Sequence, residues 1–501
     1  MQLKFSVFQN LMVAAFAICA FAVTLSAMRL ISAKSDVTNP ESANFASPIA
    51  GRSAKLYPDI NRPPYTPSPY GPLFYWTVRF ATRLLGDQIE PARTAYRISV
   101  FGSFLLLPAV VYLLLRGAAF SRVLSALGAS ASISFYYMPL FAATVRPDIP
   151  AICLSLVALW FVSHHRHASR LDLVVSAIVS TSAFMFKASY VAAPLSIAAL
   201  LVTQKRYKDL SIFVASGVIS TFLFLAAIFH GEPMISQLLL VAKSPKDLHS
   251  AITLIHLYLL PGFGSLLLPA ACAGFLMAMR SNDWRLRLYG YYFLFAVVIG
   301  FATLLQCGAN VYYFFELWIA ASLLLPSVLL KVRDSWNWTD WPLGLAASLA
   351  LAFLFVQQMH SIRQAPKDIH DYNVAKLHSL HILSTDPYLT VQGRNPLLLD
   401  PYLNAVLENK HAWSPEPILA EIRQQSFDIV VIHEINHTPV TYRTADLISR
   451  TIQDELRVNY RPLCWTAGFV VLHPLRRVNF TPEDASTVLA ERCYADGDET
   501  F

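Results

Sequence analysis

The sequence predicts an α-helical polytopic membrane protein with about 11 transmembrane helices, followed by a small C-terminal α/β domain. Of the 501 residues, 55% are hydrophobic and only 14% are charged, whereas soluble domains are about 25% charged. Long apolar runs are separated by short loops that carry lysine or arginine, which is typical of a chain that crosses a bilayer repeatedly. The net charge of +7 is spread over these loops, so the composition argues against a nucleic-acid-binding surface.

The apolar runs give the positions of the expected spans. Residues 8–31 are long enough to cross the hydrocarbon core, which needs about 20 residues, and we interpret them as an uncleaved first span. Residues 71–86 are short and carry Arg79 and Arg83, so we expect an amphipathic helix in the membrane interface. The ten further spans are predicted at residues 95–115, 123–144, 149–162, 171–186, 188–202, 210–229, 261–279, 288–305, 316–330 and 341–356.

Basic residues predict the orientation of these spans. If the N-terminus is cytoplasmic, every inner loop is positive, as the positive-inside rule requires. A full span at residues 71–86 would reverse this pattern, and the C-terminal part is therefore expected on the outer face. The basic residues of the inner loops are Arg116, Arg122, Arg166, Arg170, Lys205, Arg206, Lys208, Arg280, Arg285, Arg287, Lys331 and Arg333.

The composition becomes that of a soluble domain from about residue 357. We predict two domains: a transmembrane domain, residues 1–356, with an outer loop at 33–94, and an outer α/β domain, residues 357–501. Cys464 and Cys493 lie in the second domain and could pair outside the cytosol. Within it, strands are predicted at residues 389–392, 397–400, 427–432 and 469–472, and a helix at 417–425.

The outer loop contains a proline-rich tract that excludes an ordinary helix. Five prolines lie between Pro63 and Pro72, and each lacks an N–H and restrains the residue before it. Tyrosines such as Tyr70 are threaded through the tract. Charged residues beside a membrane make this loop a candidate reaction site, and an ordinary solvated loop is the alternative. The charged candidates are Asp36, Glu41, Asp59 and Arg62.

Further polar residues gather at the outer ends of spans. Asp148, in the turn Arg146-Pro147-Asp148-Ile149-Pro150, is either a functional acid or an acid favoured by a helix start. Lys187 is either a phosphate ligand or a snorkelling lysine, and the second is favoured for a lysine alone. The stretch 307–316 either receives a lipid or sugar ring or forms an aromatic belt, and the belt is favoured when the stretch is taken alone. Its candidates are Asn310, Tyr313 and Glu316.

The order of these features resembles the GT-C superfamily of membrane glycosyltransferases. One span is followed by an outer loop with acids and by the segment Tyr70-Gly71-Pro72-Leu73-Phe74-Tyr75-Trp76. Arg93 and Arg97 then lead the second span, and Arg146-Pro147-Asp148 follows the third. The resemblance covers roughly residues 8–316 and is one of spacing. Within the superfamily, the chain resembles the family 39-like group of protein O-mannosyltransferases and 4-amino-4-deoxy-L-arabinose lipid A transferases.

The resemblance implies an inverting glycosyltransferase of the bacterial inner membrane. It would transfer a sugar from a polyprenyl-phosphate donor to a lipid, glycan or protein acceptor on the periplasmic face. In such enzymes an acid of the first outer loop is the general base, and a second acid follows the third span. Glu41 matches the first position and Asp148 the second. The family's adjacent acidic pair is missing beside Glu41, so Asp36 and Asp59 remain rivals for the base.

The chemistry agrees with this implication. One carboxylate suffices to take the proton of an acceptor hydroxyl, and a departing phosphate needs cations, for which Arg62, Arg146 and Lys187 are candidates. We expect the acids to lie in a water-filled outer cavity, where loss of a charge costs little stability. The remaining predicted substrate-binding residues are Tyr70, Asn310, Tyr313 and Glu316.

Two other functions stay open: a transporter or flippase of lipid-linked glycans, and a non-catalytic member of the fold. Clustering of the acids at one face favours the enzyme over the transporter. No Cys/His spacing indicates a metal site, and we interpret His164, His165 and His167 as a solvated inner loop. A divalent cation stays open as a cofactor. The expected partners are the lipid-linked donor, the acceptor and membrane lipids, without nucleic acid.

Overall fold

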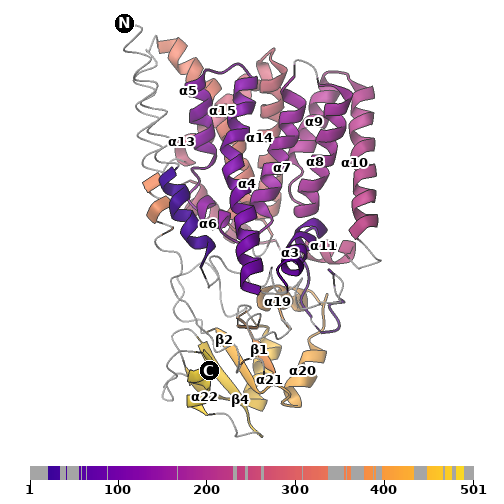
Figure 1. The fold of residues 1–501 in the computed structure, drawn as a ribbon, viewed down its shortest axis with the longest axis vertical. Helices are drawn as coiled ribbons and strands as arrows, with labels where there is room; N and C mark the ends of the chain where they lie inside the picture. Colours follow the sequence, from indigo (N-terminus) through magenta and orange to yellow (C-terminus); the bar gives the residue numbers. More distant parts are fainter. Residues whose placement is uncertain are drawn as a thin grey trace.

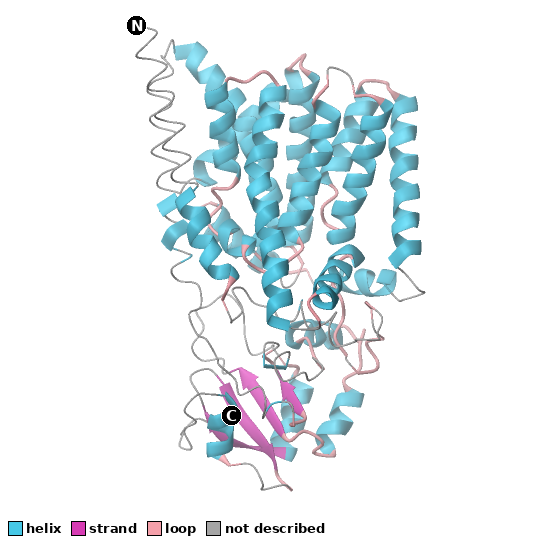
Figure 2. Ribbon diagram, in the orientation of Figure 1, coloured by secondary structure: helices cyan, strands magenta, loops and turns pink. Residues whose placement is uncertain are grey.

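The computed structural model has a helical body and a small sheet beyond one end of it (Figure 1, Figure 2). Most of the long helices run side by side, and helix α3 lies at the end of the body that faces the sheet. The structure describes residues 21–33, 41, 44, 56–57, 59–63, 65–86, 89–165, 168–228, 234–242, 246–260, 264–306, 309–336, 355–356, 358–360, 362, 377, 379–386, 389–390, 398–433, 448–465, 469–476 and 481–489.

The helical body is built from elements of very different length. After the apolar helix Phe21–Ile31, it contains α3 (Pro72–Leu84), α4 (Ile89–Gly117), α5 (Arg122–Ser132), α6 (Met138–Ala142), α7 (Asp148–Ser163), α8 (Arg170–Phe186), α9 (Ala192–Thr203), α10 (Tyr207–Ile228), α11 (Met234–Ala242), α12 (Leu248–Leu254), the π-helical turn η1 (Ile255–Leu259), α13 (Gly264–Arg280), α14 (Trp284–Leu304), the 3-10 turn η2 (Val311–Tyr313) and α15 (Phe314–Trp336).

Several of these helices are suited to cross a membrane. Within the described residues, four are long and apolar enough: Glu90–Gly117, Tyr207–Ala227, Trp284–Leu304 and Val311–Val332. A fifth results if Leu248–Leu259 and Gly264–Arg280, bent by 100°, form one span. Helix α10 exposes large apolar side chains such as Val218 and Phe222, as a lipid-facing helix does. The predicted total of eleven includes residues outside the described part, such as 341–354.

The segment predicted as the third span, residues 123–144, is interrupted. The prediction of one continuous helix there was therefore wrong. Five residues, 133–137, separate the end of α5 from the start of α6. A break inside a membrane frees backbone groups that need partners. The indole N–H of Trp318 donates to the carbonyl of Ala131 (2.8 Å), and the amide of Gln358 donates to the carbonyl of Ile133 (2.7 Å). Side chains from distant segments therefore provide the hydrogen bonds that the carbonyls at the break need. The hydropathy of residues 123–144 cannot reveal this break.

The helix predicted at residues 71–86 is present as α3, and its place in the membrane interface stays a prediction. Proline is tolerated in its first turn, where the missing N–H has no helical partner. Phe74 and Val78 are buried against the helical body. On the opposite side Trp76 and Phe80 are exposed and stack with 5.5 Å between ring centroids. This two-sided apolar character fits a helix lying at a membrane surface.

The C-terminal elements form a four-stranded sheet with helices on both faces. The strand order is β1-β2-β4-β3, with β1 parallel to β2 and the other pairs antiparallel. Alternate residues of β2 face opposite ways: Val430 packs with α20 and α21, and Val431 with α22. The elements are β1 (Ile382–Ser384), α19 (Pro401–Asn409), α20 (Glu416–Arg423), β2 (Ile429–His433), α21 (Arg450–Asn459), β3 (Tyr460–Trp465), β4 (Phe469–Pro474) and α22 (Pro482–Leu489).

Sequence patterns found part of this sheet. The strands expected at 427–432 and 469–472 and the helix at 417–425 are present as β2, β4 and α20. The predictions of strands at 389–392 and 397–400 were wrong. Residues 389–390 are helical, and residues 398–400 are a loop that leads into α19. Cys464 is disulfide-bonded, but its predicted partner, Cys493, lies outside the described residues, so that pairing stays a prediction.

The proline-rich tract connects the sheet unit to the helical body. The backbone N–H of Tyr65 donates to the carbonyl of Leu398 (3.0 Å), and the amide of Asn404 donates to the carbonyl of Tyr65 (3.0 Å). The hydroxyl of Tyr65 donates a hydrogen bond to the carboxylate of Glu421 (3.2 Å). Burial and this carboxylate raise the pKa of the Tyr65 hydroxyl to about 12, so the hydroxyl keeps its proton at neutral pH. The tract is thus an ordered strap rather than a solvated loop.

Candidate functional site

An ion pair between α7 and α8 forms the centre of the candidate site. Asp148 is the first residue of α7, and Lys187 follows the last residue of α8, so both lie at the end of the helical body near α3. The ammonium of Lys187 is 2.6 Å from Oδ1 of Asp148, and the hydroxyl of Tyr190 donates to the same oxygen (3.1 Å). Both charged side chains are buried, and a buried charge requires such a partner.

Aromatic rings enclose the lysine. The ammonium lies 3.9 Å from the ring centroid of Tyr312 and 4.5 Å from that of Tyr313. The ring centroids of Tyr70 and Tyr190 are each 5.8 Å from the ammonium. These distances are within the range of cation–π attraction, about 6 Å. The cage thus combines residues from the tract, from the α8–α9 turn and from η2.

The guanidinium of Arg146 adds a second cation to this cluster. It lies 4.7 Å from the ring centroid of Tyr312 and 4.9 Å from that of Phe141, and Nη1 is 3.9 Å from Oδ2 of Asp148. This carboxylate oxygen has no hydrogen-bond partner among the described residues. Two cations against one carboxylate make the cluster cationic. Such a cluster is suited to an anion such as a phosphate.

Close backbone packing brings Tyr70 to the cluster. The N–H of Gly71 donates to the carbonyl of Phe186 (3.1 Å), one residue before Lys187. A Cβ at position 71 would lie 2.0 Å from the carbonyl oxygen of Met185, so only glycine permits this approach. The hydroxyl of Tyr57 donates to the carbonyl of Tyr70 (2.6 Å). Sequence and packing therefore fix the tract directly beside the end of α8.

Glu41 lies in a second buried ion pair. Nε and Nη2 of Arg97 donate to its two carboxylate oxygens, both at 2.7 Å, and the N–H of Val145 donates to Oε1 (2.8 Å). Arg97 also donates to the carbonyls of Ile31 (3.2 Å) and Ala33 (2.5 Å). The pair ties the end of the first span, α4 and the turn before Arg146 together.

The expectation of a water-filled cavity around the acids was wrong. The side chains of Glu41 and Arg97 are fully buried, as is that of Asp148. A charge removed from such a pair leaves its partner uncompensated, which costs several kcal/mol. The acids of this site therefore contribute to the stability of the fold, as acids in a solvated loop would not.

The residues predicted in the stretch 307–316 lie beside the lysine cage. Glu316 is buried in the first turn of α15 and accepts a hydrogen bond from the hydroxyl of Tyr292 (3.2 Å). The side chain of Asn310 accepts from the N–H of Val311 (2.7 Å) and so begins η2. Tyr313 contacts Lys187 directly. Asn310 thus orders the turn that presents the aromatic rings.

The other predicted residues lie elsewhere. Asp59 and Arg62 form an exposed turn, 55% and 86% accessible, with 3.9 Å between their charged groups. Neighbouring Ile60 accepts a hydrogen bond from Trp413 (2.9 Å), so the turn is next to the sheet unit. Among the described residues neither side chain contacts the lysine cage. Asp36 lies outside the described residues.

Sequence reasoning missed three residues of the site. Tyr190 donates to Asp148, Tyr312 is the ring nearest Lys187, and Arg97 binds Glu41. The sequence indicates Arg97 only as an arginine at the start of a span. Its position inside an apolar helix was the available signal, because a charge there needs a partner. Tyr190 and Tyr312 carry no such signal, since tyrosines at span ends commonly form an interfacial belt.

Comparisons with known proteins identify the fold. Residues 66–230 match the sequence model of the family described as dolichyl-phosphate-mannose-protein mannosyltransferase. That range includes Tyr70, Arg146, Asp148, Lys187 and Tyr190. A comparison with curated protein sequences gave no match.

Solved structures agree with the sequence match. The structure of ArnT from Cupriavidus metallidurans bound to undecaprenyl phosphate superposes with a TM-score of 0.60 at 13% identity, covering 91% of this chain and 97% of that one. The archaeal oligosaccharyltransferase AglB from Archaeoglobus fulgidus, in complex with an inhibitory peptide and a dolichol-phosphate, gives a TM-score of 0.53 at 13% identity, covering 95% and 77%. The chain therefore has the fold of the GT-C superfamily of membrane glycosyltransferases.

Proposed function

We propose that this chain is a membrane glycosyltransferase that transfers a sugar from a polyprenyl-phosphate-linked donor to an acceptor on the periplasmic face. The observation that carries the proposal is the buried cationic cluster of Lys187 and Arg146 around Asp148, enclosed by tyrosine rings. Cations suit the phosphate of the donor, and aromatic faces suit the prenyl chain or the sugar ring. The carboxylate supplies the base that the acceptor needs.

The proposed reaction is a single displacement at the anomeric carbon. The acceptor oxygen forms a bond to this carbon while the bond to the phosphate oxygen breaks and its electron pair leaves with the lipid phosphate. The hydroxyl proton passes to a carboxylate. Such general-base catalysis typically raises the rate about 10²–10⁴-fold. Attack opposite the leaving group inverts the anomeric centre, so no glycosidase-type carboxylate pair is required.

Asp148 is our preferred base. Its Oδ2 has no hydrogen-bond partner among the described residues, whereas both oxygens of Glu41 accept hydrogen bonds from Arg97. A donor phosphate would compete with Asp148 for the ammonium of Lys187 and thereby raise the basicity of the carboxylate. Glu41 then positions the turn that carries Arg146. Glu41, Asp59 and Asp36 remain rivals that mutation can rank.

The molecules bound in the related structures support the choice of substrates. The ArnT structure holds undecaprenyl phosphate, and the AglB structure holds a dolichol-phosphate and a peptide. A further structure of the Archaeoglobus fulgidus oligosaccharyltransferase is a complex with Zn and sulfate. We therefore include a lipid, glycan or protein as acceptor and a divalent cation as a candidate cofactor.

The proposed topology follows the basic loops and the expected eleven spans. It places the N-terminus in the cytoplasm, the cluster at the outer face and residues 357–501 in the periplasm of a bacterial inner membrane. The domain boundary at residues 356–357 belongs to the same proposal. The strap from Tyr65 to Tyr70 would then link the periplasmic domain to the lysine cage.

A transfer assay with the purified full chain tests the function. The protein in nanodiscs is incubated with polyprenyl-phosphate sugars and candidate acceptors, and we expect release of free lipid phosphate together with glycosylated product. Movement of an intact lipid-linked glycan across the bilayer of sealed proteoliposomes, without product in the transfer assay, would instead identify the flippase alternative. Donor binding without product across all acceptors would identify a non-catalytic member of the fold.

A further inference from the structure

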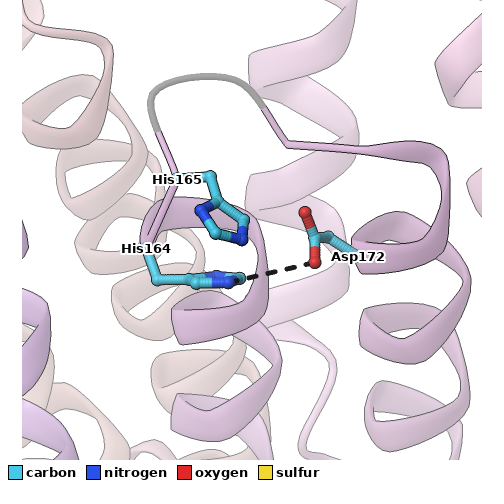
Figure 3. A group of neighbouring side chains, drawn as sticks. All are labelled: His164, His165 and Asp172. Carbon is cyan, nitrogen blue, oxygen red and sulfur yellow. Dashed lines mark ion pairs between the residues drawn. The ribbon is translucent and has the colours of Figure 1, made fainter.

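A cluster of two histidines and one aspartate lies outside the cationic site. His164 follows the last residue of α7, His165 comes next, and Asp172 lies in the first turn of α8. One ligand atom from each residue lies within 4.8 Å of the other two. Figure 3 shows both rings turned toward the carboxylate across the α7–α8 turn. Among the described residues, this is the one such group of three or more His, Cys, Asp or Glu side chains.

Hydrogen bonds orient His164 as they orient metal-binding histidines. Its Nδ1 is 2.9 Å from the carbonyl of Phe161 and 3.2 Å from that of Trp160. A carbonyl requires a proton on Nδ1, which leaves the lone pair of the neutral ring on Nε2. The Trp160 ring stacks on the imidazole at 4.7 Å and holds its plane. The lone pair therefore faces Asp172.

The carboxylate is held equally firmly. Oδ2 of Asp172 accepts from the N–H of Ser169 (2.8 Å), and the hydroxyl of Ser169 accepts from the N–H of Asp172 (3.1 Å), a capping box. Oδ1 lies 4.0 Å from Nε2 of His164. This is too long for a hydrogen bond. The gap between the Nε2 lone pair of the neutral ring and the carboxylate oxygen suits a bound cation.

We propose that His164, His165 and Asp172 bind one divalent transition-metal ion, with Zn²⁺ the best match. Two imidazoles and one carboxylate suit zinc, with water as the fourth ligand. Tetrahedral bonds of about 2.0–2.1 Å separate ligand atoms by about 3.4 Å, so His164 and Asp172 approach by about 0.6 Å. Arg285 steadies the turn by donating to the carbonyls of Ser163 (2.8 Å) and His165 (3.1 Å).

This metal would be structural rather than catalytic. Asp148 begins α7 and His164 follows its end, so at 1.5 Å per residue the two clusters are about 24 Å apart. An ion at this distance cannot touch the reacting atoms. It joins the end of α7 to the start of α8, the two helices whose opposite ends carry Asp148 and Lys187. Bound zinc should therefore raise the thermal stability of the helical body.

Zinc binding by the purified full chain tests the proposal. The protein is prepared through a histidine-free tag, stripped with a chelator and titrated with Zn²⁺ against a chromophoric indicator. We expect Asp172→Asn and His165→Ala each to bind one zinc equivalent less than the wild type, or to bind that equivalent at least tenfold more weakly. Asp172→Asn keeps an oxygen for the capping box, and His165 is exposed, so both variants should fold.

The control variant is His249→Ala, which removes an exposed histidine from α12 and should leave zinc stoichiometry unchanged. Zinc should raise the unfolding midpoint of the wild type and of this control, but not of the two cluster variants. Zinc bound near Asp148 and Lys187 would be the same in the wild type and all three variants. It would therefore not affect the differences in stoichiometry between them. Equal zinc stoichiometry and affinity in the wild type and both cluster variants would overturn the proposal.

Discussion

Replacing Asp148 by asparagine is expected to lower the rate of sugar transfer by about 10²–10⁴, the usual contribution of a general base. Asparagine is nearly isosteric and can still accept hydrogen bonds from Lys187 and Tyr190. The side chain loses the charge and basicity that take the acceptor proton. The measurement is product formation at saturating donor by folded protein in nanodiscs. Because Lys187 loses its buried carboxylate, the unfolding midpoint of the variant should also fall, so rates are compared below both midpoints.

The matched control for this change is Asp59→Asn. Asp59 is exposed, and its carboxylate accepts from the N–H of Asn61 (3.0 Å) in a turn beside the sheet unit. We expect this variant to keep the wild-type rate, because among the described residues no contact joins Asp59 to the lysine cage. Full activity of Asp148→Asn together with loss in Asp59→Asn would move the base to the proline-rich tract.

Replacing Glu41 by glutamine is expected to destabilise the protein by about 3–5 kcal/mol, the cost of breaking a buried ion pair from one side. The guanidinium of Arg97 would stay buried without a carboxylate, bonded to carbonyls near the end of the first span. The midpoint of thermal unfolding in detergent reports the change. Activity should fall because the turn before Arg146 loses an anchor.

A double-mutant cycle separates this structural role from a catalytic one. Arg97→Met combined with Glu41→Gln removes both charges, so it should destabilise by less than the sum of the two single changes. A base role for Glu41 predicts a different pattern. Glu41→Gln would then lose activity by about 10²–10⁴ even at temperatures where the variant is fully folded, and our assignment of Glu41 to positioning would be wrong.

The sequence predicts the elements of this site better than their contacts. Apolar periodicity located α4, α7, α8, α10, α14 and α15, because hydropathy is a property of each segment alone. The sequence places each of Lys187, Asp148, Arg146 and Tyr313 at the end of a span, and the structure brings the four side chains together. Their meeting follows from the packing of α7, α8 and η2, which no single segment encodes.

Two findings depended on long-range packing. Arg97 and Glu41 are 56 residues apart, and their pairing is set by how the first outer loop packs against α4. The break between α5 and α6 is satisfied by Trp318 and Gln358, again from distant segments. In the sheet, the strand predicted at 397–400 was wrong because the described residues 398–400 form a loop, and the carbonyl of Leu398 in that loop accepts a hydrogen bond from Tyr65 of the tract.

The most direct test of the account is binding of polyprenyl phosphate by the wild type and by Lys187→Met. A charged hydrogen bond contributes about 1.5–3 kcal/mol, so the variant should bind about 10–150-fold more weakly. Lys208→Met, which changes an exposed lysine in the first turn of α10, at the opposite end of the helical body from Lys187, should bind as the wild type does. Equal affinity in the wild type and Lys187→Met would contradict the claim that this buried lysine receives the phosphate of the donor.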